Sequence, residues 1–381
     1  MKLSRADRSS ITNWWWTIDR PILAACLALL GLGLLFSFAT SPAITARINI
    51  ADSFHFTRQH IFFSILALIT MIGISFFTPR NIRRFCLLLF VFAFFLMVAT
   101  LIFGVEIKGS KRWINLGFTS LQPSEFVKPS FIVLCAWLFA VQAKKGGYIG
   151  FFLSSLLCIA CSGILVLQKD IGQTMLICAT LGGLFFLAGM PIIIIIVFIA
   201  LGVVGGFGAY TFFSHVHDRI NTFLEGEASF QTEAALRAID NGGWFGQGPG
   251  EGTMKRFVPD SHTDFVFSVV GEEYGIIICL LIVFLFGFIV LRSFLIAKKE
   301  SDPFIRFSIS GITILLGLQS IINMAVNLHL MPPKGMTLPF ISYGGSSMIA
   351  IAISVGILLS LTRHKPEARY ANEYSYWIPD E

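Results

Sequence analysis

Ten long apolar runs dominate this chain of 381 residues and limit what it can fold into. Each run has roughly 20 residues, the length that an α-helix needs to cross the hydrocarbon core of a bilayer. Hydrophobic residues make up 55% of the chain and charged residues only 13%, about half of the usual charged share. We therefore predict an all-α, polytopic membrane protein, with spans at 21–40, 60–78, 85–104, 125–142, 149–167, 171–189, 191–213, 264–291, 304–328 and 345–362.

The basic residues of the short connections predict how these spans are oriented. With the N-terminus inside, sixteen of the 28 Lys and Arg residues fall on the inner side, most of them in very short segments. We therefore expect both termini to be cytoplasmic. The first run follows basic residues, as in a signal peptide, but its length and the nine later runs favour an uncleaved anchor. The predicted organisation is an N-terminal tail (1–20), a membrane domain (21–363) with a large external loop (214–263), and a C-terminal tail (364–381).

Composition excludes several other classes of function. All seven cysteines fall within predicted spans, where we expect them to pack as small buried hydrophobes and not to form disulfides or a metal site. The chain has no zinc-ligand spacing, Walker loop or dinucleotide-binding fingerprint. The net charge of +6 fits a protein anchored at a membrane surface, and nothing in the sequence indicates nucleic-acid binding.

Three external segments are longer than simple turns: 105–124, 214–263 and 329–344. Long segments of this kind are usually functional or disordered. Within the second, 230–239 has the pattern of an amphipathic helix lying near the membrane surface. The following run, 241–252, contains six glycines. It is either a flexible linker or a backbone that approaches a ligand or another segment closely. The Trp244-Phe245 pair and the basic pair at 255–256 favour the second interpretation.

Four ionisable residues lie at the start of the eighth span, in otherwise apolar surroundings: His262, Asp264, Glu272 and Glu273. Charges in such places are costly and are therefore functional candidates. If the helix begins near Thr263, then Asp264, Ser268 and Glu272 share one face. Asp264, at the external mouth, then acts as a general base or forms an ion pair between helices. We expect Glu272 and Glu273 to be structural, and His262 to be either a substrate contact or a hydrogen-bonding loop residue.

The ninth span and the loop after it form a second polar region. Gln319, Asn323 and Asn327 follow one another at four-residue spacing on an apolar helix, where interhelical hydrogen bonding is the expected explanation. The segment 331–347 combines prolines, glycines, hydroxyls and Lys334, which predicts an ordered re-entrant or surface loop. Because irregular backbone at membrane depth must be surrounded by protein or water, this loop implies a cavity.

Further charged groups belong to the external connections. Glu125 and Lys128 lie one turn apart at the start of the fourth span and can pair. The segment 168–172 is a tight polar connection. The external segments also contain a set of cations: Lys108, Lys111, Arg112, Arg219, Lys255, Arg256 and Lys334. A cationic external cavity would suit a substrate with a phosphate or pyrophosphate head and a lipid tail. Composition and spacing do not name a reaction.

A series of motifs occurs in a fixed order along the chain: Lys111-Arg-Trp-Ile-Asn-Leu-Gly117, Gln122-Pro-Ser-Glu125, Gln168-Lys-Asp-Ile-Gly172, Gly242-Gly-Trp-Phe-Gly-Gln-Gly248, His262-Thr-Asp-Phe-Val-Phe267, Glu272-Glu273 and Lys334-Gly-Met-Thr-Leu-Pro-Phe-Ile-Ser-Tyr-Gly-Gly-Ser-Ser347. Together they resemble the signatures of the SEDS family (shape, elongation, division and sporulation), which includes FtsW, RodA and SpoVE. The resemblance extends from about residue 20 to residue 363, with the family's ten spans. One departure is Lys169, where the family usually has proline.

The resemblance implies the SEDS fold, with its large external loop between helices 7 and 8, and the polymerisation of peptidoglycan. SEDS proteins are glycosyltransferases that extend glycan strands from lipid II, a disaccharide-pentapeptide on undecaprenyl pyrophosphate. The family's essential acidic residue falls on Asp264, which would accept the proton of the acceptor 4-hydroxyl in an inverting displacement. Cations would stabilise the leaving pyrophosphate, and the candidate substrate-binding residues are Lys111, Arg112, Trp113, Arg219, Lys255, Lys334 and Ser342.

The remaining polar candidates are expected to be structural: Glu125, Lys128, Glu272, Gln319, Asn323 and Asn327. The resemblance implies no nucleotide cofactor, because the pyrophosphate link of the substrate already carries the energy of cleavage. A divalent cation (Mg²⁺ or Mn²⁺) on the pyrophosphate is compatible with this chemistry, although the sequence shows no dedicated metal site.

The tryptophan-rich start and the glycine-rich run look more like FtsW, the division-type member in Gram-negative bacteria, than RodA. This implies septal cell-wall synthesis in the bacterial inner membrane, at the division septum. The implied partners are a class B penicillin-binding protein, which supplies the transpeptidase, and other divisome proteins. Three alternatives stay open: a lipid II flippase, a RodA-type polymerase for cell elongation, and a non-catalytic scaffold for division proteins.

Overall fold

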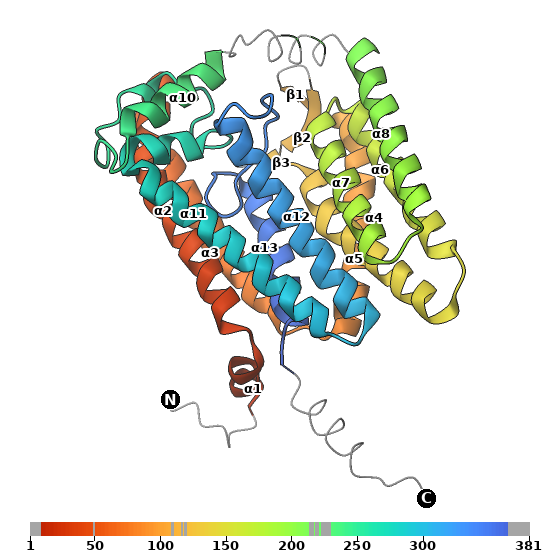
Figure 1. Cartoon of the computed structure of the whole chain (residues 1–381). Coiled ribbons are helices and arrows are strands. Elements are labelled where there is room, and N and C mark those ends of the chain that lie inside the picture. Colours follow the sequence, from red (N-terminus) through yellow and green to blue (C-terminus); the bar gives the residue numbers. More distant parts are fainter. Residues whose placement is uncertain are drawn as a thin grey trace, which may run out of the picture.

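The apolar runs fold into long helices that lie side by side (Figure 1). The structure is a computed structural model, and it describes residues 9–364 except 49, 108–109, 116, 118–119, 213–216, 218–220 and 222–229. Its helices are α1 (Ser10–Thr17), α2 (Arg20–Arg47), α3 (His55–Ser75), α4 (Pro79–Phe103), α5 (Pro123–Lys145), α6 (Ile149–Leu167), α7 (Ile171–Leu187), α8 (Ile192–Phe212), α10 (Phe230–Gly242), α11 (Val266–Lys299), α12 (Pro303–Asn327) and α13 (Gly345–Leu361).

The predicted all-α, polytopic architecture is confirmed. Among the described residues, eight helices are long and apolar enough to cross a membrane, and the shorter apolar helices α7 and α13 complete the ten predicted spans. Helix starts follow the expected signals, because α5 and α12 begin with proline and the Asp302 side chain accepts a hydrogen bond from Phe304 N (2.9 Å). The spans of α5 and α12 are 67% and 72% buried, and nearly all residues of α13 are buried, so these three helices form the centre of the bundle.

The described part of the chain starts and ends at the same end of the bundle. Arg363, after α13, donates through Nε to Thr17 Oγ1 (3.0 Å), and His364 N donates to Thr17 O (2.8 Å). α10 and the strands lie at the opposite end (Figure 1). This arrangement agrees with ten membrane crossings, because an even number of crossings returns the chain to the side on which it started. We call the end with Thr17 and Arg363 the termini face, and the end with α10 and the strands the loop face.

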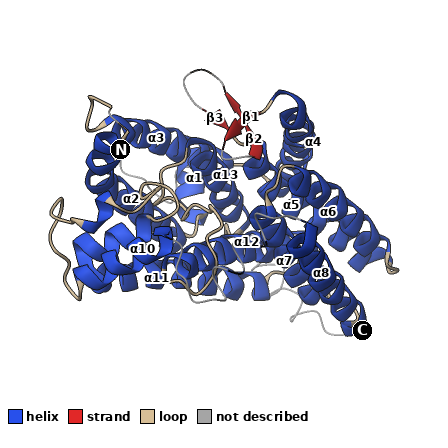
Figure 2. Cartoon of the chain, turned by 90° about the horizontal axis from the view of Figure 1, so that it is seen from above, coloured by secondary structure: helices blue, strands red, loops and turns tan. Residues whose placement is uncertain are grey.

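A small antiparallel sheet in the segment 105–124 was not predicted. It consists of β1 (Val105–Ile107), β2 (Ser110–Asn115) and β3 (Ser120–Leu121), in the order β1-β2-β3. Seen from above, it lies near the loop-face ends of α4 and α13 (Figure 2). Strand β2 contains Lys111, Arg112 and Trp113, so the sheet fixes the backbone of three candidate substrate-binding residues.

The glycine-rich segment 242–252 packs against a break in helix α11. Gly275 has φ 79° and ψ 176°, so the helix is kinked there and backbone groups on both sides of it lose their intrahelical partners. Gln247 N and Gly248 N donate to the carbonyls of Glu272 (2.9 Å) and Glu273 (3.0 Å), and Ile276 N donates to Gly243 O (3.0 Å). The close-approach interpretation of this segment is therefore confirmed, and the flexible-linker alternative is wrong.

We predict that Gly275→Ala lowers the stability of the protein by about 2 kcal/mol or more, the sum of a clash and a strained backbone. A Cβ at this position would lie 2.3 Å from Trp244 O and 2.5 Å from Gly246 N, at a positive φ. Thermal unfolding in detergent and limited proteolysis of 242–252 would measure the effect. Gly287→Ala is the matched control, because a Cβ there has no atom within 4 Å. Equal melting temperatures for both variants would contradict the prediction.

Candidate active site

Asp264 lies in a tight turn directly before α11. Asp260, which has a positive φ of 51°, accepts hydrogen bonds at its carbonyl from Thr263 N (3.0 Å), Asp264 N (3.1 Å) and Phe265 N (3.3 Å). The helix begins only at Val266, so the expectation that it starts near Thr263 is wrong. Asp264 therefore does not share a helical face with the residues that follow it. Its side chain is partly exposed at the loop face.

The two glutamates deeper in α11 hold the segment 241–255. Glu272 is fully buried and accepts hydrogen bonds from Met254 N (2.7 Å), Lys255 N (2.7 Å) and Asn241 Nδ2 (3.1 Å). Glu273 forms a buried ion pair with Lys255, whose ammonium also donates to Gly250 O (3.0 Å). These contacts fit the structural role that we expected for both glutamates. Lys255 is only 5% exposed, so the structure leaves it out of the cationic cavity that we expected.

The side-chain amides of α12 donate mostly to backbone carbonyls and not to side chains of other helices. Asn323 Nδ2 and Asn327 Nδ2 both donate to Asp264 O (2.9 Å each), and Asn323 Nδ2 also donates to Met336 O (2.6 Å). Asn327 Oδ1 accepts from Ser268 Oγ (2.6 Å), which is the interhelical bond that we expected. For Asn323 the expectation of an interhelical partner is wrong, because its amide joins the turn of Asp264 to the loop after α12.

That loop, residues 329–344, is attached to the turn on its other side as well. Ser342 Oγ donates to Thr263 O and accepts from Leu338 N (2.8 Å), and Tyr343 N donates to His262 O (2.8 Å). Ser342 is 4% exposed, so its hydroxyl supports the loop and does not face a substrate. His262 stacks on Tyr343, with ring centroids 5.5 Å apart, which supports the loop role left open for it.

The loop also brings a cation to the neighbourhood of Asp264. A Cβ added to Gly335 would lie 3.4 Å from Asp264 Oδ2, so the carboxylate faces Gly335. Lys334 is the preceding residue, and its Nζ lies 2.7 Å from Met175 Sδ on α7. The loop therefore places Lys334 between α7 and the turn that carries Asp264.

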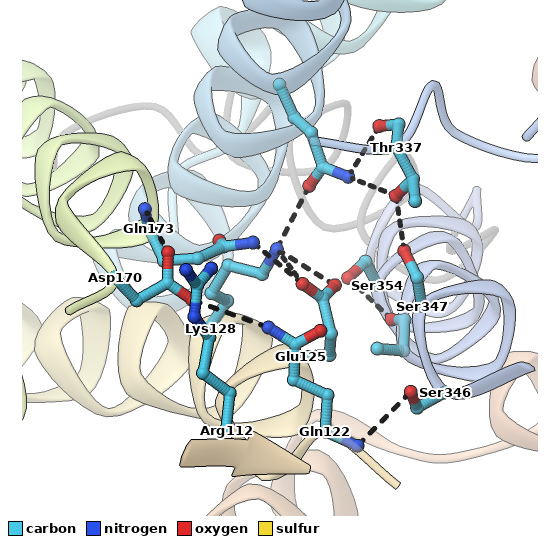
Figure 3. A network of polar contacts seen from close by, with 12 residues as sticks. Arg112, Gln122, Glu125, Lys128, Asp170, Gln173, Thr337, Ser346, Ser347 and Ser354 are labelled. Carbon is cyan, nitrogen blue, oxygen red and sulfur yellow. Dashed lines mark hydrogen bonds and ion pairs between the residues drawn. The ribbon is translucent and has the colours of Figure 1, made fainter. Parts of the chain in front are cut away.

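A chain of buried polar contacts connects the sheet β1–β3 to this loop through α7, α5 and α12 (Figure 3). Its first link is Arg112 on β2, whose guanidinium lies 3.2 Å from Asp170 Oδ2. Asp170 caps α7 by accepting from Gln173 N (3.3 Å). Burial raises the pKa of Asp170, and the positive charge of Arg112 opposes the rise.

The inner links of this polar chain lie between the central helices. Gln173 Nε2 donates to Glu125 Oε1 (2.9 Å), and Lys128 Nζ lies 2.9 Å from Glu125 Oε2, which confirms the predicted pair. Lys128 Nζ also donates to Gln319 Oε1 (3.3 Å), and Gln319 Nε2 donates to Thr337 O (3.1 Å). Lys128 and Glu125 are 2% and 3% exposed, so their charges are stabilised by each other and by amides, and not by water.

The other candidates are less closely connected to the site. Lys111 is exposed on β2, and Trp113 is partly buried opposite Val105 in the sheet. Arg219 lies outside the described residues. Sequence reasoning did not single out Gln173 or Thr337, which complete the polar chain. Gln173 directly follows the connection motif at 168–172, and that position was the available signal.

The fold and the site define a class of protein. It is a polytopic α-helical membrane protein whose loop face holds a partly exposed carboxylate beside a cationic loop, supported by a buried polar chain. The family model of the FtsW/RodA/SpoVE cell cycle proteins matches residues 20–367. The chain belongs to this family.

Relatives and solved structures agree with this assignment. The chain is 44% identical over 367 residues to the probable peptidoglycan glycosyltransferase FtsW of Caulobacter vibrioides, covering 96% of this chain and 94% of the relative. It is 31% identical to the protein of the same name in Pseudomonas fluorescens, with 92% and 89% covered. Its fold resembles a chain of a peptidoglycan synthase complex (TM-score 0.76, 23% identity, 93% and 99% covered). It also resembles RodA of Thermus thermophilus (TM-score 0.65, 26% identity, 91% and 97% covered).

Proposed function

We propose that this chain is a peptidoglycan glycosyltransferase that polymerises lipid II into glycan strands and releases undecaprenyl pyrophosphate. Its relatives at 44% and 31% identity, over nine tenths of its length, carry the name of this activity. The observation that carries the proposal is the position of Asp264. A turn, two amides of α12 and the loop 329–344 hold its backbone, while its carboxylate is partly exposed next to Gly335.

Asp264 acts as the general base in the proposed reaction. The oxygen of the acceptor 4-hydroxyl attacks the anomeric carbon of the donor from the side opposite the leaving group, and its proton passes to the carboxylate of Asp264. The bond between the anomeric carbon and the pyrophosphate oxygen breaks with inversion. Lys334, Arg112 and Lys111 are the described cations proposed to stabilise the negative charge that develops on the pyrophosphate. Arg112 keeps 24% of its side chain exposed although it pairs with Asp170.

We further propose that the polymerase works in septal synthesis, in the bacterial inner membrane, with both termini cytoplasmic. The names of the relatives support the division role, and the concentration of Lys and Arg in the short connections of the termini face supports the orientation. Similarity to a chain of a peptidoglycan synthase complex supports a class B penicillin-binding protein as partner. Cell depletion tests the role: filaments with unclosed septa support it, and rounded cells indicate elongation.

The activity is tested with the purified full-length chain and fluorescent lipid II, alone and with the penicillin-binding partner. The expected result is a ladder of glycan strands and the release of undecaprenyl pyrophosphate. Movement of lipid II across a bilayer without polymer would replace the proposal with the flippase alternative. If the protein forms no polymer and moves no lipid II but fully supports division in cells, it is a scaffold.

The metal requirement is a separate part of this proposal. Among the described residues, no group of three or more His, Cys, Asp or Glu side chains is arranged to hold a metal ion. We therefore propose that any Mg²⁺ or Mn²⁺ enters with the pyrophosphate of lipid II and is not a resident cofactor. Polymerisation in EDTA, compared with added Mg²⁺ or Mn²⁺, measures the dependence, and metal content that survives extensive dialysis would contradict a substrate-borne ion.

A further inference from the structure

A small pocket lies at the termini face, far from the candidate active site. It has a volume of about 90 Å³ and is formed by the first turns of α4 and α12 and the last turns of α5. Its lining residues are Arg83, Trp137, Ala140, Val141, Lys144, Asp302 and Phe304. None of these residues takes part in the polar chain or in the contacts of Asp264.

The charged residues of the pocket leave a net positive charge. Within the described part of the chain, neither Arg83 nor Lys144 forms an ion pair with a carboxylate. Arg83 lies over the ring of Phe304, with its guanidinium carbon 5.1 Å from the ring centroid, and this contact fixes its direction. The carboxylate of Asp302 is the opposing charge, and it already accepts a hydrogen bond from Phe304 N (2.9 Å) as the cap of α12.

The α5 side of the pocket carries apolar groups beside one cation. Trp137, Val141 and Lys144 are spaced as one face of α5, so an aromatic ring, an aliphatic group and an ammonium follow one another toward the end of the helix. Trp137 and Val141 are partly exposed, and Phe304 is buried beneath Arg83. Tryptophan is enriched where membrane helices meet the headgroup region, which places the pocket at that depth.

We propose that this pocket binds the headgroup of an anionic phospholipid in the leaflet at the termini face. The phosphate would contact Arg83 and Lys144, and the glycerol and first acyl carbons would contact Trp137 and Val141. Basic pockets between membrane helices on the cytoplasmic side suit such headgroups. A soluble anion fits less well, because it would leave the exposed apolar surface of Trp137 and Val141 uncovered. The proposal is independent of the proposed polymerase activity.

The test uses the full-length protein, native mass spectrometry and titration with phosphatidylglycerol or phosphatidylcholine. The pocket variant is Arg83→Gln with Lys144→Gln. The matched control is Arg84→Gln with Lys145→Gln, which removes the same charge from the exposed neighbouring positions. The parent protein should retain phosphatidylglycerol in preference to phosphatidylcholine. The pocket variant should bind phosphatidylglycerol at least about tenfold more weakly, while the control changes less than about threefold.

Three outcomes would overturn the proposal. Equal losses in the two double variants would mean that the termini face attracts lipid through its overall charge. Equal binding of the two lipids by the parent protein would mean that the pocket does not select anions. Arg83→Lys separates loss of the binding site from misfolding, because it keeps a positive charge at this position. It should bind within about threefold of the parent, and tenfold weaker binding by this variant, with an unchanged melting temperature, would also overturn the assignment.

Discussion

Replacing Asp264 by Asn is expected to lower the rate of glycan formation by about 10²–10⁴-fold, the usual contribution of a general base. The amide has nearly the same shape as the carboxylate but cannot accept the proton of the sugar hydroxyl. The backbone carbonyl of residue 264 would still accept hydrogen bonds from Asn323 and Asn327, so the turn should keep its position. Polymerisation of fluorescent lipid II by purified protein measures the rate, and binding of lipid II should remain.

The matched control for this experiment is Asp240→Asn. Asp240 is an exposed carboxylate near the end of α10, also at the loop face, and it belongs to neither the Asp264 turn nor the polar chain. Its substitution should leave polymerisation within about twofold of the parent, as expected for a surface change. Glycan synthesis by Asp264→Asn at the rate of this control would remove Asp264 from the mechanism.

Lys128→Met is expected to destabilise the protein by about 3–5 kcal/mol, because it leaves the buried carboxylate of Glu125 without its cation. Among the described residues, Gln173 Nε2 would then be the one side-chain donor left to the Glu125 carboxylate. The variant also removes the hydrogen bond to Gln319, which supports the loop at Thr337. Thermal unfolding in detergent measures the stability, and the lipid II assay measures the accompanying loss of activity.

The double variant Glu125→Gln with Lys128→Met separates charge from position. Removing both charges should restore most of the lost stability, because no buried charge then lacks a partner. Activity should stay low, since the link from α5 to Gln319 is still absent. Full activity in the double variant would show that the polar chain contributes only to stability, and a melting temperature of Lys128→Met equal to that of the parent would contradict the buried-pair argument.

The membrane fold could be predicted because its signal is spread over many residues. Each span needs roughly 20 apolar residues in sequence, and single errors at helix ends do not change their number. The Glu125–Lys128 pair was also predictable, because both residues lie on one helix and three-residue spacing brings them together. The sheet β1–β3 was not predictable in the same way, because its strands are short and their pairing depends on backbone contacts between segments.

In the candidate site, the spacing of residues along the chain did not predict which groups contact one another. Spacing suggested one helical face for Asp264, Ser268 and Glu272. In the structure, three successive backbone amides, at residues 263–265, donate to the carbonyl of Asp260, and the helix begins only after this turn. Lys255 is buried because it pairs with Glu273, eighteen residues away, and because the kink at Gly275 lets the segment 242–252 approach α11. Such pairings are set by tertiary packing, so the sequence could indicate the candidates but not their partners.

The loop 329–344 also has a consequence for the order in which the protein becomes competent during synthesis. Its contacts reach back to Thr263 and His262, and Gln319 on the preceding helix reaches Lys128, 191 residues earlier. Domains fold largely from the N-terminus as the chain emerges. A nascent chain that ends before residue 329 would contain Asp264 without the loop that positions it. The last tenth of the described chain therefore completes the site, and incomplete chains left in the membrane should be inert.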